Sequence, residues 1–126
     1  MRMIVCGGRD DHLTQLGKAA LWGLSALYGP TLTVVHGAAR GVDREAAAYC
    51  KQLGVDVEPH PADWRGRGVA AGPERNRAML DAGPIDLVLA VKARFDWSLE
   101  RGGSENMVAL AKAAGVPAYV LQRVGP

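Results

Sequence analysis

Residues 3–8 read Met-Ile-Val-Cys-Gly-Gly, a short apolar run closed by two glycines. A continuous apolar run of this length is typical of a strand buried on both faces, as in a parallel sheet covered by helices. Similar runs recur along the chain, each bounded by glycine, proline or polar residues. The sequence therefore predicts five strands, which begin near Met3, Leu32, Val55, Asp86 and Val116.

Apolar residues at helical spacing lie between these runs and predict four helices. The first has an apolar face of Leu13, Leu16, Ala20, Leu21, Leu24 and Leu27, with Asp10 or Asp11 as N-cap, and stops at Gly29-Pro30. The second carries Val42, Ala46, Tyr49, Cys50 and Leu53 and ends at Gly54. A loop rich in glycine, proline and arginine, from about residue 59 to 72, precedes a third helix that opens at Pro73 and stops near Gly83-Pro84. The last has Met107, Leu110, Ala111 and Ala114 on its core face and ends at Gly115.

Strands and helices thus alternate along the whole chain. This order predicts a Rossmann-like three-layer α/β/α fold with a mostly parallel five-stranded sheet and right-handed crossovers. No internal repeat or linker interrupts the pattern, so we expect residues 1–126 to form one domain. A chain of this length buries enough surface to fold without a metal or disulfide.

The charge, apolar runs and cysteines of the sequence limit the classes of partner and cofactor that we expect. The net charge of +2 and the lack of a basic stripe argue against nucleic acid as a partner. There is no signal segment, and the apolar runs are too short to span a bilayer, so we expect a cytoplasmic protein with no membrane partner. Cys6 and Cys50 are far apart and match no metal-ligand spacing, which predicts reduced thiols, no metal site and no cofactor.

Four glycine-bearing loops precede helices at the expected carboxyl edge of the sheet, where open α/β sheets bind ligands. Three of them contain arginine, whose planar guanidinium suits phosphate, and eleven of the fifteen basic residues are Arg. Glycine lets backbone approach a ligand, and a helix N-terminus offers free N–H groups. The predicted ligand-binding residues are Gly7, Gly8, Arg9, His36, Gly37, Arg40, Gly41, Asp43, Arg75, Asn76, Gly102, Gly103 and Ser104.

Each loop alone also has a plainer explanation, because tight turns before helices favour glycine, and a high-GC genome would raise the arginine content. His36 is either a ligand contact or a satisfied half-buried histidine. Trp64 either stacks on a base or packs at an edge, and Arg77 is a contact or a surface charge. The connection from Lys92 to Gly103, with its two aromatic residues, is open to three interpretations: a lid, a dimer contact or an anchored loop. Arg40 and Arg75 are both expected near solvent.

Three segments together resemble a known family. They are His36-Gly-Ala-Ala-Arg-Gly-Val-Asp43, Pro61-Ala-Asp-Trp64, and Gly72-Pro-Glu-Arg-Asn-Arg77 with Met79. They are similar to the SLOG superfamily, which includes the LOG phosphoribohydrolases and the DprA/Smf DNA-processing proteins, and within it to the small stand-alone YspA-type, cpYpsA-related domains of bacteria and phages. The resemblance spans Arg2 to about Leu121. It implies a nucleotide or nucleotide-derived ligand and, by analogy, a homodimer.

One departure from the superfamily separates two functions. The LOG enzymes cleave the N-glycosidic bond of nucleoside monophosphates with a Glu three residues after a Gly-Thr pair. If Gly103-Ser104 stands for that pair, the position holds Met107. The resemblance thus favours a binding or sensing module. The alternative is a phosphoribohydrolase-like enzyme with Glu105, Asp43 or Glu100 as its carboxylate.

Overall fold

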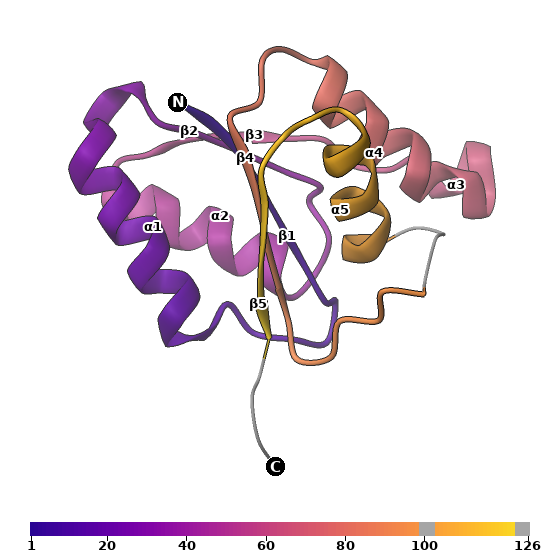
Figure 1. Cartoon of the computed structure of the whole chain (residues 1–126), viewed down its shortest axis with the longest axis horizontal. Helices are drawn as coiled ribbons and strands as arrows, with labels where there is room; N and C mark the ends of the chain where they lie inside the picture. Colours follow the sequence, from indigo (N-terminus) through magenta and orange to yellow (C-terminus); the bar gives the residue numbers. More distant parts are fainter. Residues whose placement is uncertain (99–102, 123–126) are drawn as a thin grey trace.

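The structure, a computed structural model, describes residues 1–98 and 103–122, and its strands form one five-stranded sheet (Figure 1). The strands are β1 Arg2–Gly7, β2 Thr33–His36, β3 Asp56–Pro59, β4 Leu87–Lys92 and β5 Ala118–Gln122. The helices are α1 Thr14–Tyr28, α2 Val42–Leu53, α3 Trp64–Arg67, α4 Ala71–Asp81 and α5 Gly103–Ala113, with 3-10 turns at Gly29–Thr31 and Gly68–Ala70. The order is β3-β2-β1-β4-β5 and every pairing is parallel, which confirms the Rossmann-like α/β prediction.

Helices cover both faces of the sheet and create two cores. Helices α1 and α2 lie on one side and α4 and α5 on the other (Figure 1). On the α1–α2 side, Leu21 and Ala46 pack against Val5 and Val34. On the α4–α5 side the sheet residues Ile4 and Val88 meet the helical residues Met79, Met107 and Val108. The middle residues of β1, β2 and β4 are apolar because both faces of these strands are buried.

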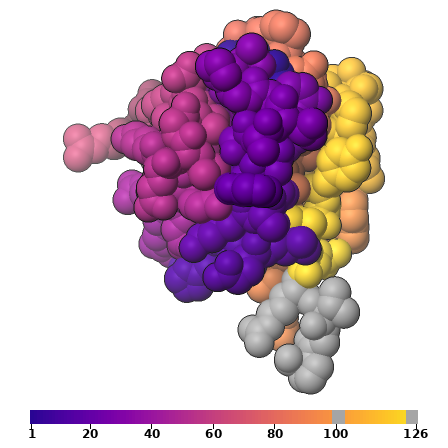
Figure 2. All heavy atoms as spheres, turned by 90° about the vertical axis from the view of Figure 1, so that its left-hand side faces the viewer, coloured from indigo at the N-terminus to yellow at the C-terminus, as the bar shows by residue number. Residues whose placement is uncertain are grey.

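Helix α1 differs from the expectation at its start and along its face. Leu13 occupies the N-cap without a side-chain hydrogen bond, so neither Asp10 nor Asp11 caps the helix. Leu16 is 61% and Leu27 78% exposed, although both belong to the apolar set. The apolar residues span a wider arc of the helix than the sheet covers, and these two lie on its outer margin. Figure 2 faces this surface, with α1 in front and β5 beside it.

The segment from residue 59 to 72 is more regular than a loop. It contains α3, whose first turn is capped by Asp63, since the side chain accepts a hydrogen bond from the Gly66 N–H at 3.0 Å. Helix α4 begins at Ala71, two residues before the predicted start at Pro73. Proline is tolerated there because N–H groups in the first turn have no intrahelical acceptor.

Two further features concern the cysteines and the helices. Cys6 and Cys50 are buried free thiols. Within residues 1–98 and 103–122, no helix combines the length and apolar character that crossing a membrane requires.

The two leucines of α1 that differ most in burial provide a test of this packing. Leu21 is 1% exposed, so Leu21→Ala should lower the free energy of unfolding by about 2–5 kcal/mol through lost contacts and a cavity. Leu27→Ala is the matched control on the same helix and should change it by less than about 0.5 kcal/mol. Urea unfolding measures both. Equal losses would mean that α1 is rotated relative to the sheet.

Candidate ligand-binding cleft

A cleft of about 380 Å³ lies at the carboxyl ends of β1 and β4. It is formed where the loop after β1, the loop before α2, the first turns of α4 and the N-terminus of α5 meet. Its lining comprises Cys6, Gly7, Gly8, Arg9, Asp10, Asp11, Ala39, Asp43, Trp64, Arg75, Asn76, Met79, Lys92, Gly103 and Ser104. Polar groups therefore come together from segments up to about a hundred residues apart in the chain.

Asp43 holds the loop before α2 in shape. Its Oδ2 accepts a hydrogen bond from the Gly37 N–H at 2.9 Å, and the side chain is buried. Burial raises the pKa of Asp43 to about 6, against the opposing effect of that hydrogen bond and of the nearby Arg75 charge. The carboxylate is thus a brace for the loop as well as part of the cleft wall.

Glycines permit two close approaches in this loop. A side chain on Gly37 would overlap the guanidinium of Arg75, which donates from Nη1 to the Gly37 carbonyl at 2.6 Å. Gly41 has φ +79°, and a Cβ there would lie 2.5 Å from the carbonyl oxygen of Gly8. Because these two positions have no side chain, the loops can approach each other closely and form one continuous wall of the cleft.

Asn76 connects α4 to the N-terminus of α5. Its Nδ2 donates to the Gly103 carbonyl at 3.1 Å and to Oδ1 of Asn106 at 3.0 Å. Its Oδ1 accepts from Nε of Arg75 at 3.0 Å, which orients the guanidinium beside the cleft. Arg75 is therefore half-buried and held by two hydrogen bonds, contrary to the expectation that it lies near solvent, and burial lowers its pKa.

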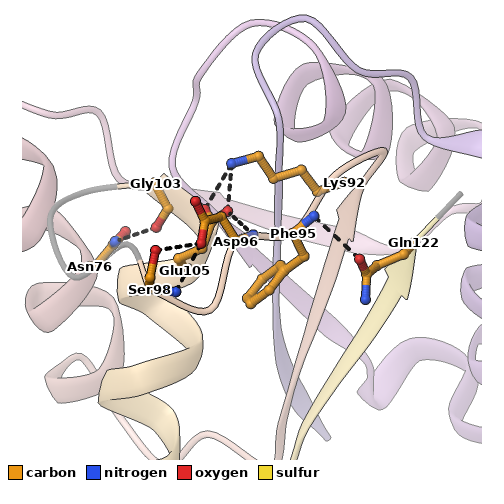
Figure 3. Close-up of polar contacts among 8 residues, drawn as sticks. All are labelled: Asn76, Lys92, Phe95, Asp96, Ser98, Gly103, Glu105 and Gln122. Carbon is orange, nitrogen blue, oxygen red and sulfur yellow. Dashed lines mark hydrogen bonds and ion pairs between the residues drawn. The ribbon is translucent and has the colours of Figure 1, made fainter.

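Lys92 and Glu105 form an ion pair at the far side of the cleft (Figure 3). The Lys92 amino group donates to both carboxylate oxygens of Glu105, at 2.8 and 2.7 Å. The Asp96 N–H donates to Oε2 of Glu105 at 2.9 Å. Burial alone would raise the pKa of Glu105, but the ammonium group and this N–H lower it more, so the net shift is downward. Glu105 is thus a charged anchor that positions Lys92.

The described part of the connection after β4 is an anchored loop over residues 93–98. Phe95 is buried in the α4–α5 core, and its N–H donates to Oε1 of Gln122 at 3.4 Å (Figure 3). Trp97 packs on Phe95 with ring centroids 4.6 Å apart, and the Lys112 ammonium lies 4.3 Å from the Trp97 ring. Phe95 therefore anchors the loop, whereas Trp97 is 59% exposed.

The predicted ligand-binding residues divide into four groups. Gly7, Gly8, Arg9, Asp43, Arg75, Asn76, Gly103 and Ser104 line the cleft. Gly37 and Arg40 line a second hollow beside it, and Arg40 is exposed as predicted. His36 and Gly41 line neither: His36 is buried and its Nδ1 accepts from the Ala38 N–H at 3.0 Å, as a satisfied histidine would. Gly102 and the candidate carboxylate Glu100 lie outside the described residues.

Several residues of the cleft were missed from the sequence. Lys92 has no predicted role beyond starting a connection, yet it ends the strand next to β1, where the strand order reverses. Asp10 or Asp11 is predicted as the N-cap of the first helix, and both instead line the cleft. Cys6 and Met79 are buried residues that form its floor. Only the end-of-strand position of Lys92 carried a usable signal.

The sequence is similar to a known family and to a phage protein. The profile of the YspA, cpYpsA-related SLOG family matches residues 1–66. The chain is also 40% identical over 96 residues to the "Gene 61 protein" of Mycobacterium phage D29, covering 71% of this chain and 70% of the phage protein. No solved structure matches.

The raised pKa of Asp43 predicts a pH dependence of stability. Between its unfolded pKa, about 3.9, and its folded pKa of about 6, the folded protein binds a proton that the unfolded chain has lost. Stability contributed by Asp43 therefore falls as the pH rises through this window, by up to about 2–3 kcal/mol. We expect Asp43→Asn to remove this fall, as measured by urea unfolding from about pH 4 to pH 7.

The comparison between wild type and Asp43→Asn isolates the contribution of Asp43 to the pH dependence of stability. Burial also lowers the pKa of His36, and its effect runs in the opposite direction, but it is present in both proteins. The pKa of Glu105 is lowered, so this residue changes the pH dependence of stability only when the pH falls below the ordinary pKa of glutamate. Parallel pH profiles for wild type and Asp43→Asn would mean that Asp43 is charged throughout the window.

Proposed function

The chain belongs to the YspA, cpYpsA-related SLOG family, and from that premise we propose that its cleft binds a nucleotide or nucleotide-derived phosphate ligand, as a sensor or binding module. The observation that carries this proposal is the meeting of Gly8, Arg75 and Ser104 in one cleft at the carboxyl ends of β1 and β4. A fixed guanidinium and a helix N-terminus beside close-approaching backbone suit a phosphate group.

The cleft supports binding more than catalysis. Among the carboxylates of the described residues, Glu105 is fully engaged by Lys92 and the Asp96 N–H. Asp43 is engaged by the Gly37 N–H. Both carboxylates therefore have structural partners, and of the two only Asp43 lines the cleft.

A second candidate function is hydrolysis of an N-glycosidic bond. It is favoured by one observation, that Asp43 lines the cleft with a pKa of about 6, a value suited to general acid–base chemistry near neutral pH. Homodimer formation stays a prediction from the resemblance.

Binding is tested with Arg75→Gln. A nucleotide at a hundred times its dissociation constant should stabilise the wild-type protein by roughly 2.7 kcal/mol in a thermal-shift screen. Arg75→Gln should weaken nucleotide binding by roughly 1.5–3 kcal/mol for each charge-assisted hydrogen bond lost. It should also lower stability, because Arg75 bonds to the Gly37 carbonyl and to Asn76. Affinity is therefore measured by calorimetry at a temperature where both proteins are folded.

Arg77→Gln is the matched control. Arg77 follows two residues later on α4, is exposed, and lines a hollow with Leu110 and Ala113 rather than the cleft. Its replacement should leave nucleotide affinity unchanged. No stabilisation by any mono-, di-, cyclic or ADP-ribose-type nucleotide would refute the proposal.

A separate experiment distinguishes binding from hydrolysis. We expect no release of free base when the protein is incubated with AMP, GMP, CMP or UMP, because glycoside cleavage needs a carboxylate that stabilises an oxocarbenium-like state or activates water. Chromatography of the products measures this. Base release that disappears in Glu105→Gln or Asp43→Asn would instead identify an enzyme whose carboxylate has moved from the position held here by Met107.

A further inference from the structure

A second hollow of about 370 Å³ opens beside the cleft, and we call it the arginine hollow. Four of its lining residues are arginines, Arg9, Arg40, Arg44 and Arg75, and Trp64 and Pro61 form its apolar side. Arg9, Trp64 and Arg75 also line the cleft, so the two hollows share a wall.

The charges of the two hollows differ. The cleft has three cations, Arg9, Arg75 and Lys92, and they face three carboxylates, Asp10, Asp11 and Asp43. The arginine hollow has four cations, and none of the described residues that line it is acidic. The hollow is therefore the more electropositive of the two, and a concave cationic surface concentrates anions.

Existing contacts leave much of this charge available. Arg40 pairs with Asp10 at 3.0 Å, but both side chains are largely exposed, and such a pair is worth little. Nε of Arg44 donates to the Ala38 carbonyl at 3.4 Å, a long hydrogen bond. The guanidinium of Arg9 lies 4.8 Å from the Trp64 ring centroid, a stacking that orients it at the shared wall.

Two of the backbone N–H groups in this lining are already engaged. The Gly37 N–H already donates to Asp43, and the Ala38 N–H already donates to His36. An anion in the arginine hollow would therefore be held by guanidinium groups, which bind phosphate through paired N–H donors.

We propose that the arginine hollow takes a second phosphate group of the ligand whose first phosphate lies in the cleft. The ligand is then a nucleotide with two phosphate groups, a diphosphate or a dinucleotide, and not a mononucleotide. This inference rests on the proposed nucleotide-binding function. Arg9 at the shared wall contacts both groups, and Arg40 and Arg44 contact only the second.

The test compares ligands that differ in phosphate number. Calorimetry with AMP, ADP and the 5'-phosphorylated dinucleotide pApA should show the two-phosphate ligands binding about tenfold or more tightly than AMP, as expected for an added charge-assisted contact. Their affinity should also fall more steeply with added salt, because more charge is neutralised.

Arg44→Gln provides the variant, since Arg44 is exposed and lines only the arginine hollow. It should weaken ADP or pApA binding about five- to tenfold and leave AMP binding unchanged; Arg40→Gln should act in the same direction. Arg77→Gln, outside both hollows, is the control. A thermal unfolding profile that matches that of the wild-type protein shows that each variant is folded.

The outcomes separate the two proposals. Equal affinity for all three ligands, with no effect of Arg44→Gln, overturns the second phosphate site while the nucleotide cleft stands. Loss of AMP binding in Arg44→Gln to the same extent as ADP binding also overturns it, because Arg44 would then act on the first phosphate. Binding of none of the three refutes the proposed function itself.

Discussion

Strand β1 pairs with β2 on one side and with β4 on the other, and the chain winds away from it in opposite directions. Because the connections after β1 and β4 lead to opposite faces, no crossover covers the space beyond their carboxyl ends. The cleft occupies this space. Its position follows from strand order, while its chemistry depends on which side chains the surrounding loops present there.

Those side chains are held mainly by one another. Asp43 fixes the Gly37 N–H, the Gly37 carbonyl accepts from Arg75, and Arg75 in turn bonds to Asn76. Asn76 then reaches the Gly103 carbonyl at the start of α5. A chain of hydrogen bonds thus links the loop after β2 to two helices and fixes the shape of the cleft, and a site with a fixed shape needs less ordering when it binds a ligand.

The sequence sufficed for the elements whose signal is local. Short apolar runs identified the buried strands β1, β2 and β4, and glycine correctly marked the ends of α1 and α2. The sequence did not suffice where tertiary contacts determine which side chains are buried. Leu16 and Leu13 have the same apolar character, but only the position of α1 on the sheet determines which of them is buried.

The same limit applies to the site. Glycine-rich loops before helices indicated where the cleft would lie, and eight of the predicted residues line it. The partners of charged groups were not predictable, because Lys92 and Glu105 lie thirteen residues apart and meet only through the fold. His36 was considered a contact from its motif, yet its ring is directed to its own loop.

Met107 shows why a motif position differs from a functional position. It stands where the resemblance places the catalytic Glu of the LOG enzymes, but here its side chain is 0% exposed and packs with Ile4, Val88 and Val108. A carboxylate among these apolar side chains would lose its hydration without gaining a partner, a cost of several kcal/mol. Glu105 precedes it by two residues, about 200° around the helix, and faces Lys92 instead. In the N-terminal turn of α5, Met107 thus packs in the core and Glu105 forms an ion pair with Lys92. The turn supports the cleft by positioning Lys92 and contributes no free carboxylate to it.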